Sequence, residues 1–108
     1  HMLDASAFSS MKDGVVLINT ARGALMDTDA LLANLQTGKI GALGLDVLEN
    51  ESALFYYDRR EELLPNQDLY LLKSYPNVVI THHMAFYTQQ CVETMVRDSL
   101  RGAAESCR

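Results

Sequence analysis

The sequence has no cluster of lysine or arginine residues, and it carries few basic residues overall. Nine Lys and Arg residues stand against 14 Asp and Glu residues, which gives a formal net charge of −5. Nucleic acids and anionic membrane surfaces attract proteins through dense positive charge. We therefore expect no nucleic-acid partner and no membrane partner.

Long apolar runs, signal-peptide patterns and metal-binding spacings are also missing. The apolar runs are far shorter than the ~20 residues that cross a bilayer. Cys91 and Cys107 are isolated, and the adjacent His82 and His83 would face opposite sides of an extended chain. No G-x-S-x-G motif indicates a serine hydrolase. These absences favour a cytoplasmic protein with reduced thiols and no metal site.

Three short apolar runs are present in a chain of 108 residues, 48% of them hydrophobic and 21% charged. This length fits one small domain or a piece of a larger one. The run Val15–Asn19 has the pattern of a strand buried on both faces, and residues 40–47 and Val78–Ile80 predict two further strands. The sequence therefore predicts three strands, two of them short and wholly apolar.

Helical patterns separate these strands. Asp4, Asp27 and Thr88 are placed to cap helices, with Gly14 and Gly38 placed to end the first two. Residues 68–73 predict a further short helix inside an otherwise irregular segment. Alternation of helix and strand implies a parallel sheet with crossover connections. We predict an α/β fold that is about half of a doubly wound parallel sheet.

Polar residues follow each predicted strand. Arg22 follows the first, Asp46 with Glu51 the second, and His83 the third. The carboxyl ends of parallel strands share one edge, where α/β proteins bind ligands. An arginine grips a carboxylate, a histidine exchanges a proton near neutral pH, and a carboxylate beside that histidine orients its ring. This combination suits the reduction of a keto acid.

Each of these residues also has a structural explanation. Arg22 could form a structural ion pair or cap a helix, Asp46 and the loop glutamates could be solvated, and His83 could satisfy backbone groups. The coincidence of all three types at successive strand ends favours the catalytic interpretation.

Three segments resemble the D-isomer-specific 2-hydroxyacid dehydrogenases, in the order and spacing of that family. Residues 11–27, M-K-D-G-V-V-L-I-N-T-A-R-G-A-L-M-D, resemble one signature of the family. Residues 44–51, G-L-D-V-L-E-N-E, resemble its D-V-x-E-x-E segment. Residues 81–88, T-H-H-M-A-F-Y-T, resemble T-P-H-x-A-F-Y-T in the form seen in D-lactate dehydrogenases, with His82 in place of the proline.

The resemblance implies roles for these residues and NAD as the cofactor. Arg22 binds and orients a 2-keto acid, and His83 is the general acid/base. Glu51, rather than Glu49, is the carboxylate that pairs with His83. The resemblance further implies that the cofactor is bound by Thr20, Ala21, Arg22 and Asp46. The substrate is expected to contact Arg22 and Phe86.

The resemblance also implies that the sequence is incomplete. No G-x-G-x-x-G motif is present to cradle the cofactor's pyrophosphate. We interpret residues 3–108 as the carboxyl-terminal half of a Rossmann NAD-binding domain, without the substrate domain, and His1 and Met2 as an expression-tag remnant. The aromatic and acidic residues 55–62 resemble the D-lactate branch.

The expected parent protein is a homodimeric enzyme that interconverts pyruvate and D-lactate, with the 108-residue chain inactive by itself. Two alternatives remain at this point. One is a different D-2-hydroxyacid dehydrogenase, acting on 2-hydroxyisocaproate, glycerate or phosphoglycerate. The other is a non-enzymatic NAD-sensing module of the corepressor type. The complete Arg22, Glu51 and His83 set favours an enzyme.

Overall fold

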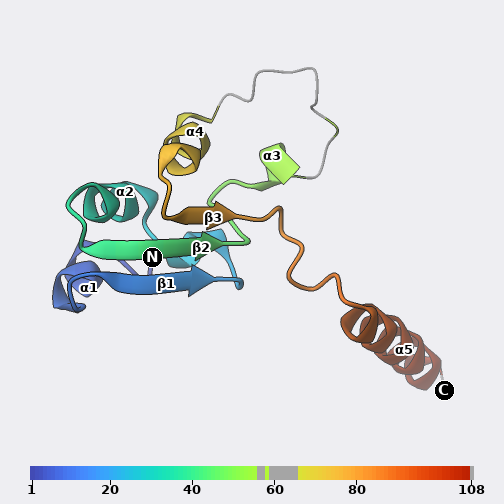
Figure 1. Ribbon diagram of the computed structural model, residues 1–108. Helices are drawn as coiled ribbons and strands as arrows, with labels where there is room; N and C mark the ends of the chain where they lie inside the picture. Colours follow the sequence, from blue (N-terminus) through green and yellow to red (C-terminus); the bar gives the residue numbers. More distant parts are fainter. Residues whose placement is uncertain (56–57, 59–65, 108) are drawn as a thin grey trace.

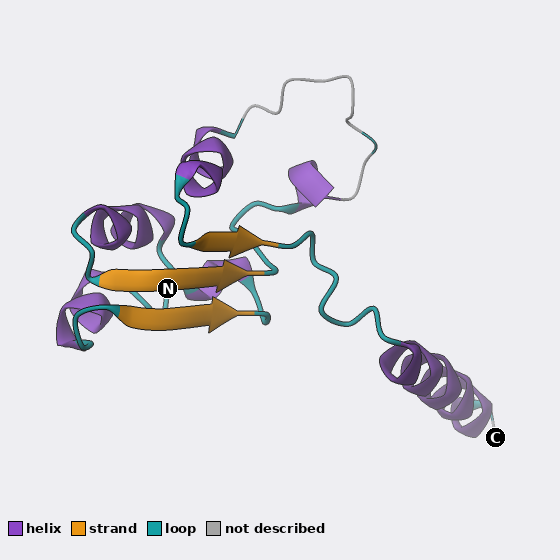
Figure 2. Cartoon of the chain, in the orientation of Figure 1, coloured by secondary structure: helices purple, strands orange, loops and turns teal. Residues whose placement is uncertain are grey.

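The computed structural model describes residues 1–55, 58 and 66–107, in which helices and strands alternate (Figures 1 and 2). In chain order the elements are α1 (Ala5–Ser10), β1 (Val15–Asn19), the 3₁₀ turn η1 (Gly23–Leu25), α2 (Thr28–Gln36), β2 (Ile40–Leu45), α3 (Ser52–Phe55), α4 (Gln67–Ser74), β3 (Val78–Ile80) and α5 (Gln89–Ser106).

The three strands form one parallel sheet in the order β1-β2-β3, which confirms the predicted α/β fold with a parallel sheet. β1 pairs with β2 from Val15 to Asn19, and β2 pairs with β3 from Leu43 to Leu45. Because all three strands run the same way, their carboxyl ends meet at one edge (Figure 2). The loops that follow the strands therefore leave from this edge.

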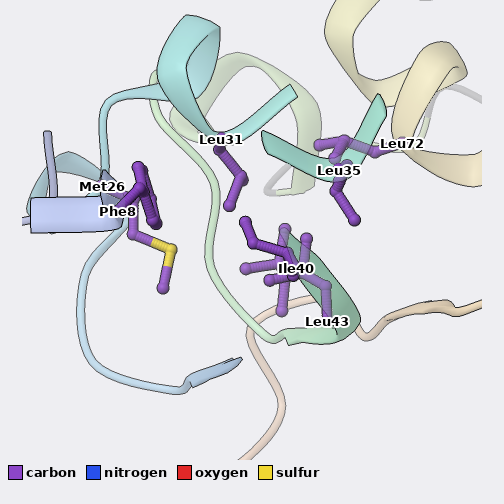
Figure 3. Packing of buried hydrophobic residues seen from close by; sticks show 8 residues of the cluster. Phe8, Met26, Leu31, Leu35, Ile40, Leu43 and Leu72 are labelled. Atoms are coloured by element: carbon purple, nitrogen blue, oxygen red, sulfur yellow. The ribbon is translucent and has the colours of Figure 1, made fainter. Parts of the chain in front are cut away.

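The hydrophobic core lies on one face of the sheet, beneath α1, α2 and α4. Phe8, Leu31, Leu35 and Leu72 from these helices pack with Ile40 and Leu43 of β2 (Figure 3). On the opposite face Val16, Ile18 and Val79 are 64%, 74% and 66% exposed. The prediction that β1 is buried on both faces is therefore wrong: within the described residues, the helices of the core cover only one face of the sheet.

Side-chain caps begin the helices where the sequence places them. Asp4, Asp27 and Thr88 each accept a hydrogen bond from a backbone amide three residues ahead, as predicted. Gly14 does not end α1. The helix ends at Ser10, where the Met11 amide bonds to the carbonyl of Phe8, and Gly14 takes its positive φ of 73° in the turn before β1.

Two boundaries differ from those predicted. β2 ends at Leu45 rather than at residue 47, because the backbone carbonyl of Asp46 accepts from the His83 amide instead of continuing a strand. The predicted helix at residues 68–73 is slightly longer, as α4, and Asn66 caps it. The one-turn helix α3 was not predicted. Most of residues 55–62, the segment that resembles the D-lactate branch, lie outside the described residues.

Helix α5 projects away from the rest of the molecule (Figure 1). It has 18 residues, none of them buried, and its apolar Met95, Val96 and Leu100 are exposed. The radius of gyration is accordingly 17.3 Å, whereas a compact domain of 100 residues has about 13 Å. Among the helices described, none is long and apolar enough to span a membrane.

Candidate active site

The carboxyl edge of the sheet gathers the segments that carry the predicted site residues. Residues 20–22 follow β1, residues 46–51 follow β2 and residues 81–88 follow β3. Pairing of β2 with β3 brings the second and third segments together, although they are at least 30 positions apart in sequence. The sheet therefore assembles residues that the sequence keeps far apart.

Glu51 and His83 form a hydrogen-bonded ion pair at this edge. The Nδ1 atom of His83 lies 2.7 Å from Oε1 of Glu51, and the two side chains are 21% and 14% exposed. The other carboxylate oxygen of Glu51 accepts from the Leu48 amide at 2.9 Å. Because both oxygens have partners, the carboxylate is fixed in position and in turn orients the imidazole.

Glu49 lies elsewhere. Its Oε2 atom accepts from the Thr28 amide at 3.1 Å and from the Thr28 hydroxyl, so it stabilises the first turn of α2. Its Oε1 atom lies 2.6 Å from Nε2 of His1. The structure thus separates two glutamates that are two positions apart: Glu51 contacts His83, and Glu49 binds a helix end.

His83 occupies a left-handed backbone conformation, with a φ of 53°, that is uncommon for a residue other than glycine. Asp46 builds the turn that holds it. The Asp46 carbonyl accepts from the His83 amide at 2.7 Å, and its carboxylate accepts from the amides of Met84 and Ala85, each at 2.8 Å, and from the Thr81 hydroxyl. Hydrogen bonds to a single aspartate therefore hold the backbone of this turn.

The Asp46 side chain is 3% exposed, yet the carboxyl stays ionised. Burial is the largest single influence and raises its pKa. The hydrogen bonds from Thr81, Ala85 and Met84, with the nearby charge of His83, together outweigh burial, so that the pKa of Asp46 lies below its usual value. The predicted contact of Asp46 with the cofactor remains a prediction.

Arg22 follows a turn that Asn19 shapes. The Asn19 side chain, 7% exposed, accepts from the Ala21 amide at 3.0 Å and donates to the Arg22 carbonyl at 2.9 Å. The exposed Arg22 guanidinium donates through Nη1 to the Ala21 carbonyl at 2.7 Å, so the side chain folds back on its own turn. Sequence reasoning missed Asn19, although asparagine at a strand end is a known turn former.

Gly23 allows the loop after β2 to lie against this turn. It is buried, and a Cβ atom at this position would collide with the backbone of Leu48 and Glu49. Only glycine therefore fits after Arg22. This close approach places the loop that leads to Glu51 against the loop that carries Arg22.

Aromatic side chains line the His83 turn. The ring of Phe86 meets the His83 imidazole edge-on, with centroids 6.3 Å apart at 77°, and it also contacts Tyr87. Phe86 is 46% exposed. The structure thus brings Asp46, Glu51, His83 and Phe86 together, and it places Thr20, Ala21 and Arg22 at the same edge.

These residues fit the nicotinamide end of a dinucleotide. Residues 20–22 are exposed at the carboxyl edge of a parallel sheet, the edge that also carries the carboxylate–imidazole pair. The sequence has no G-x-G-x-x-G motif, the glycine-rich cradle that holds a pyrophosphate. In the part of the chain that the structure describes, no group of three or more His, Cys, Asp or Glu residues is placed to hold a metal ion.

Comparison with known proteins defines the class of this fold and site. Residues 1–85 match the model of the family described as "D-isomer specific 2-hydroxyacid dehydrogenase, NAD binding domain". The chain belongs to the D-isomer-specific 2-hydroxyacid dehydrogenase family, within its NAD-binding domain. NAD is accordingly the cofactor, as predicted.

Individual relatives are similar over nearly the whole chain. An aromatic 2-oxoacid reductase of Clostridium sporogenes is 44% identical over 105 residues, which are 97% of this chain and 32% of the reductase. D-lactate dehydrogenase of Escherichia coli is 39% identical over 94% of this chain and 31% of its own length. A D-lactate dehydrogenase structure from Sporolactobacillus sp. has a TM-score of 0.86 and 44% identity, over 93% of this chain and 30% of that one. The chain thus spans about a third of the length of the relatives it matches.

Proposed function

We propose that the chain supplies the acid/base side of the active site of an NAD-dependent D-2-hydroxyacid dehydrogenase. The observation that carries this proposal is the 2.7 Å contact between Glu51 and His83 at the carboxyl edge of a parallel sheet. Residues 3–108 would be the carboxyl-terminal part of the NAD-binding domain, with the glycine-rich half and the substrate domain supplied by further sequence. This extent agrees with the third of each relative that the chain matches.

His83 exchanges the proton in this proposal. Its Nδ1 atom is engaged by Glu51, so the proton given to the C2 oxygen of the keto acid is carried on Nε2. The Glu51 carboxylate stabilises the imidazolium that must be present before reduction. In the reverse direction the same nitrogen takes the proton from the hydroxyl group.

Arg22 is the proposed substrate anchor. A guanidinium binds a carboxylate through two parallel hydrogen bonds, which would orient the 2-keto acid relative to His83. Thr20 and Ala21 would contribute the backbone that lies along the cofactor. Asp46 would also lie near the cofactor, in addition to holding the His83 turn. When bound, NAD supplies or accepts the hydride at C2.

Pyruvate and D-lactate are the proposed substrate pair, in keeping with the D-lactate dehydrogenases among the relatives. One observation favours an aromatic 2-oxo acid as a second candidate. Met84, Phe86 and Tyr87 are exposed beside His83 and offer an apolar wall to a larger substrate side chain. The relative from C. sporogenes is named for such substrates. Comparing kcat/KM for pyruvate and phenylpyruvate distinguishes the two.

The test uses the full-length protein that contains this chain, with NADH oxidation as the readout. We expect His83→Ala and Glu51→Gln to lower kcat/KM, the former by roughly 10²–10⁴-fold. Glu49→Gln is the matched control, because Glu49 bonds Thr28 instead of His83. Normal keto-acid reduction by His83→Ala would show that His83 is not the general acid/base, whereas the absence of reduction by the unsubstituted full-length protein would favour a non-enzymatic, NAD-sensing module.

We also propose a cytoplasmic homodimer. Two exposed free thiols, Cys91 and Cys107, suit a reducing compartment. The exposed apolar sheet face and the apolar stripe of α5 offer surface for association.

A further inference from the structure

A second contact runs alongside the ion pair of Glu51 and His83. The rings of Phe55 and His82 lie with their centroids 5.2 Å apart and their planes tilted by 54°. Phe55 comes four residues after Glu51, and His82 comes immediately before His83. The ring contact and the ion pair therefore join the same two segments of chain.

Phe55 is tied to Glu51 by the single turn of α3. The carbonyl of Glu51 accepts from the amides of Leu54 and Phe55, at 2.8 Å and 3.0 Å. Leu54, in the same turn, is buried. The backbones of Glu51 and Phe55 therefore belong to one hydrogen-bonded turn.

His82 is tied to the β2 end on the other side of the contact. The amide of the preceding Thr81 bonds to the Leu45 carbonyl at 2.8 Å, and the following His83 amide bonds to the Asp46 carbonyl. Asp46 fixes this turn through Thr81, Met84 and Ala85, but none of these bonds reaches α3. The His83 turn is thus firmly held. The position of Glu51 relative to it depends on the Leu48 amide, which bonds the Glu51 carboxylate, and on the contact that Phe55 makes with His82.

We propose that His82 is a positioning residue, whose ring packs on Phe55 and holds Glu51 in hydrogen-bonding register with His83. The inference rests on the proposed acid/base role of His83, but the structural part of it concerns this chain alone. Under this proposal, any aromatic ring at position 82 can pack on Phe55, and the packing does not require a charged ring. Small shifts matter because misplacement of a catalytic group by 1 Å can cost about a hundredfold in rate.

Kinetics on the full-length protein provide the first test. We expect His82→Ser to lower kcat by roughly tenfold to a hundredfold, with KM for the keto acid changed by about twofold at most. His82→Phe retains a flat ring and should restore kcat. Phe55→Leu removes the partner ring and should reproduce the loss, and the double variant should lose no more than either single variant.

A spectroscopic test on the 108-residue chain separates this inference from the proposed function. With ¹⁵N-labelled imidazoles, the Nδ1 proton of His83 should give a downfield signal that reports its bond to Glu51. We expect this signal to be lost in His82→Ser and in Phe55→Leu and retained in His82→Phe. The result does not depend on turnover, so it stands even if His83→Ala leaves keto-acid reduction intact.

Two outcomes would overturn the inference. An unchanged His83 signal together with unchanged kcat in His82→Ser would mean that the ring contact positions nothing. Loss of the signal in both His82→Ser and His82→Phe, in chains that circular dichroism shows to be folded, would mean that the imidazole of His82 acts by another route than packing on Phe55.

Discussion

Asp46 is the residue on which the geometry of the site depends most directly. It accepts from the backbone of three consecutive residues, 83–85, and from the hydroxyl of Thr81, while its own amide bonds to the Asn19 carbonyl. A side-chain amide in its place would keep one acceptor and would point NH₂ donors at amides that also donate. The carboxylate therefore has no close substitute.

We expect Asp46→Asn to lower the free energy of unfolding by about 2–4 kcal/mol, because it leaves buried donors unsatisfied. Urea unfolding followed by circular dichroism measures this change. Asp13→Asn is the control: Asp13 also bonds a partner, Lys39, at 2.8 Å, but its side chain is 89% exposed and its loss should have little effect. Equal changes in the two variants would contradict the structure.

The stability of the chain should depend on pH through Asp46. Its pKa is lower in the folded state than in an unfolded chain, where it is about 3.9. The stabilisation is therefore fully present above the unfolded pKa and is lost as the pH falls through the folded-state pKa. The free energy of unfolding can be measured with urea at pH values between about 2 and 6. It should fall less steeply toward acid pH in Asp46→Asn than in the unsubstituted chain. Parallel acid limbs would exclude this linkage.

At the scale of elements, the close approach of two loops depends on Gly23. We expect Gly23→Ala to lower the free energy of unfolding by at least about 2 kcal/mol, because the new methyl group meets the Leu48 backbone, which cannot rotate away. Gly102→Ala, in the exposed helix α5, is the matched control. Nothing lies within 4 Å of its Cβ position, and it should stabilise the helix by about 0.5–1 kcal/mol. In thermal unfolding, the melting temperature should fall in Gly23→Ala and rise slightly in Gly102→Ala.

Most of the elements could be predicted from local patterns. Val15–Asn19 and Val78–Ile80 are short apolar runs, and Asp4, Asp27 and Thr88 cap helices through bonds that span only three residues. Because parallel strands share one edge, the gathering of Asp46, Glu51 and His83 there also followed from the order of elements, whereas the choice of Glu51 over Glu49 as the partner of His83 rested on the family resemblance. The role of Asp46 did not, because its four partners at residues 81–85 lie 35 or more positions away. The exposed face of β1 was missed because an apolar run does not reveal whether helices cover both of its sides.

At the scale of the whole molecule, one face of the sheet is left uncovered by the described residues. Val16 and Ile18 of β1 and Val79 of β3 expose more than half of their surface, and such apolar faces favour association. We expect the 108-residue chain to self-associate with rising concentration in light scattering. Ile18→Lys should shift it toward the monomer. Tyr70→Lys, which alters an exposed residue of α4, should not. A monomer at all concentrations would contradict this expectation.

Under the proposed function, the cofactor site would be shared between this chain and further sequence of the parent protein. The residues at the carboxyl edge suit the nicotinamide, and no glycine-rich motif is present for the phosphates. We expect NADH fluorescence titration of the 108-residue chain to show no binding at micromolar concentrations, and the full-length protein to bind. Tight binding by the short chain would mean that the phosphates contribute little.

The His83 turn is coupled to the parallel sheet through the position of Asp46. The turn around His83 has its hydrogen-bond acceptors on Leu45 and Asp46, at the end of β2, so it cannot close until β3 has docked beside that strand. This docking brings together residues 35 positions apart and carries the entropy cost of a long loop. The His83 turn is therefore coupled to the pairing of β2 with β3, so a variant that separates β3 from β2 should also lose the contact between Glu51 and His83.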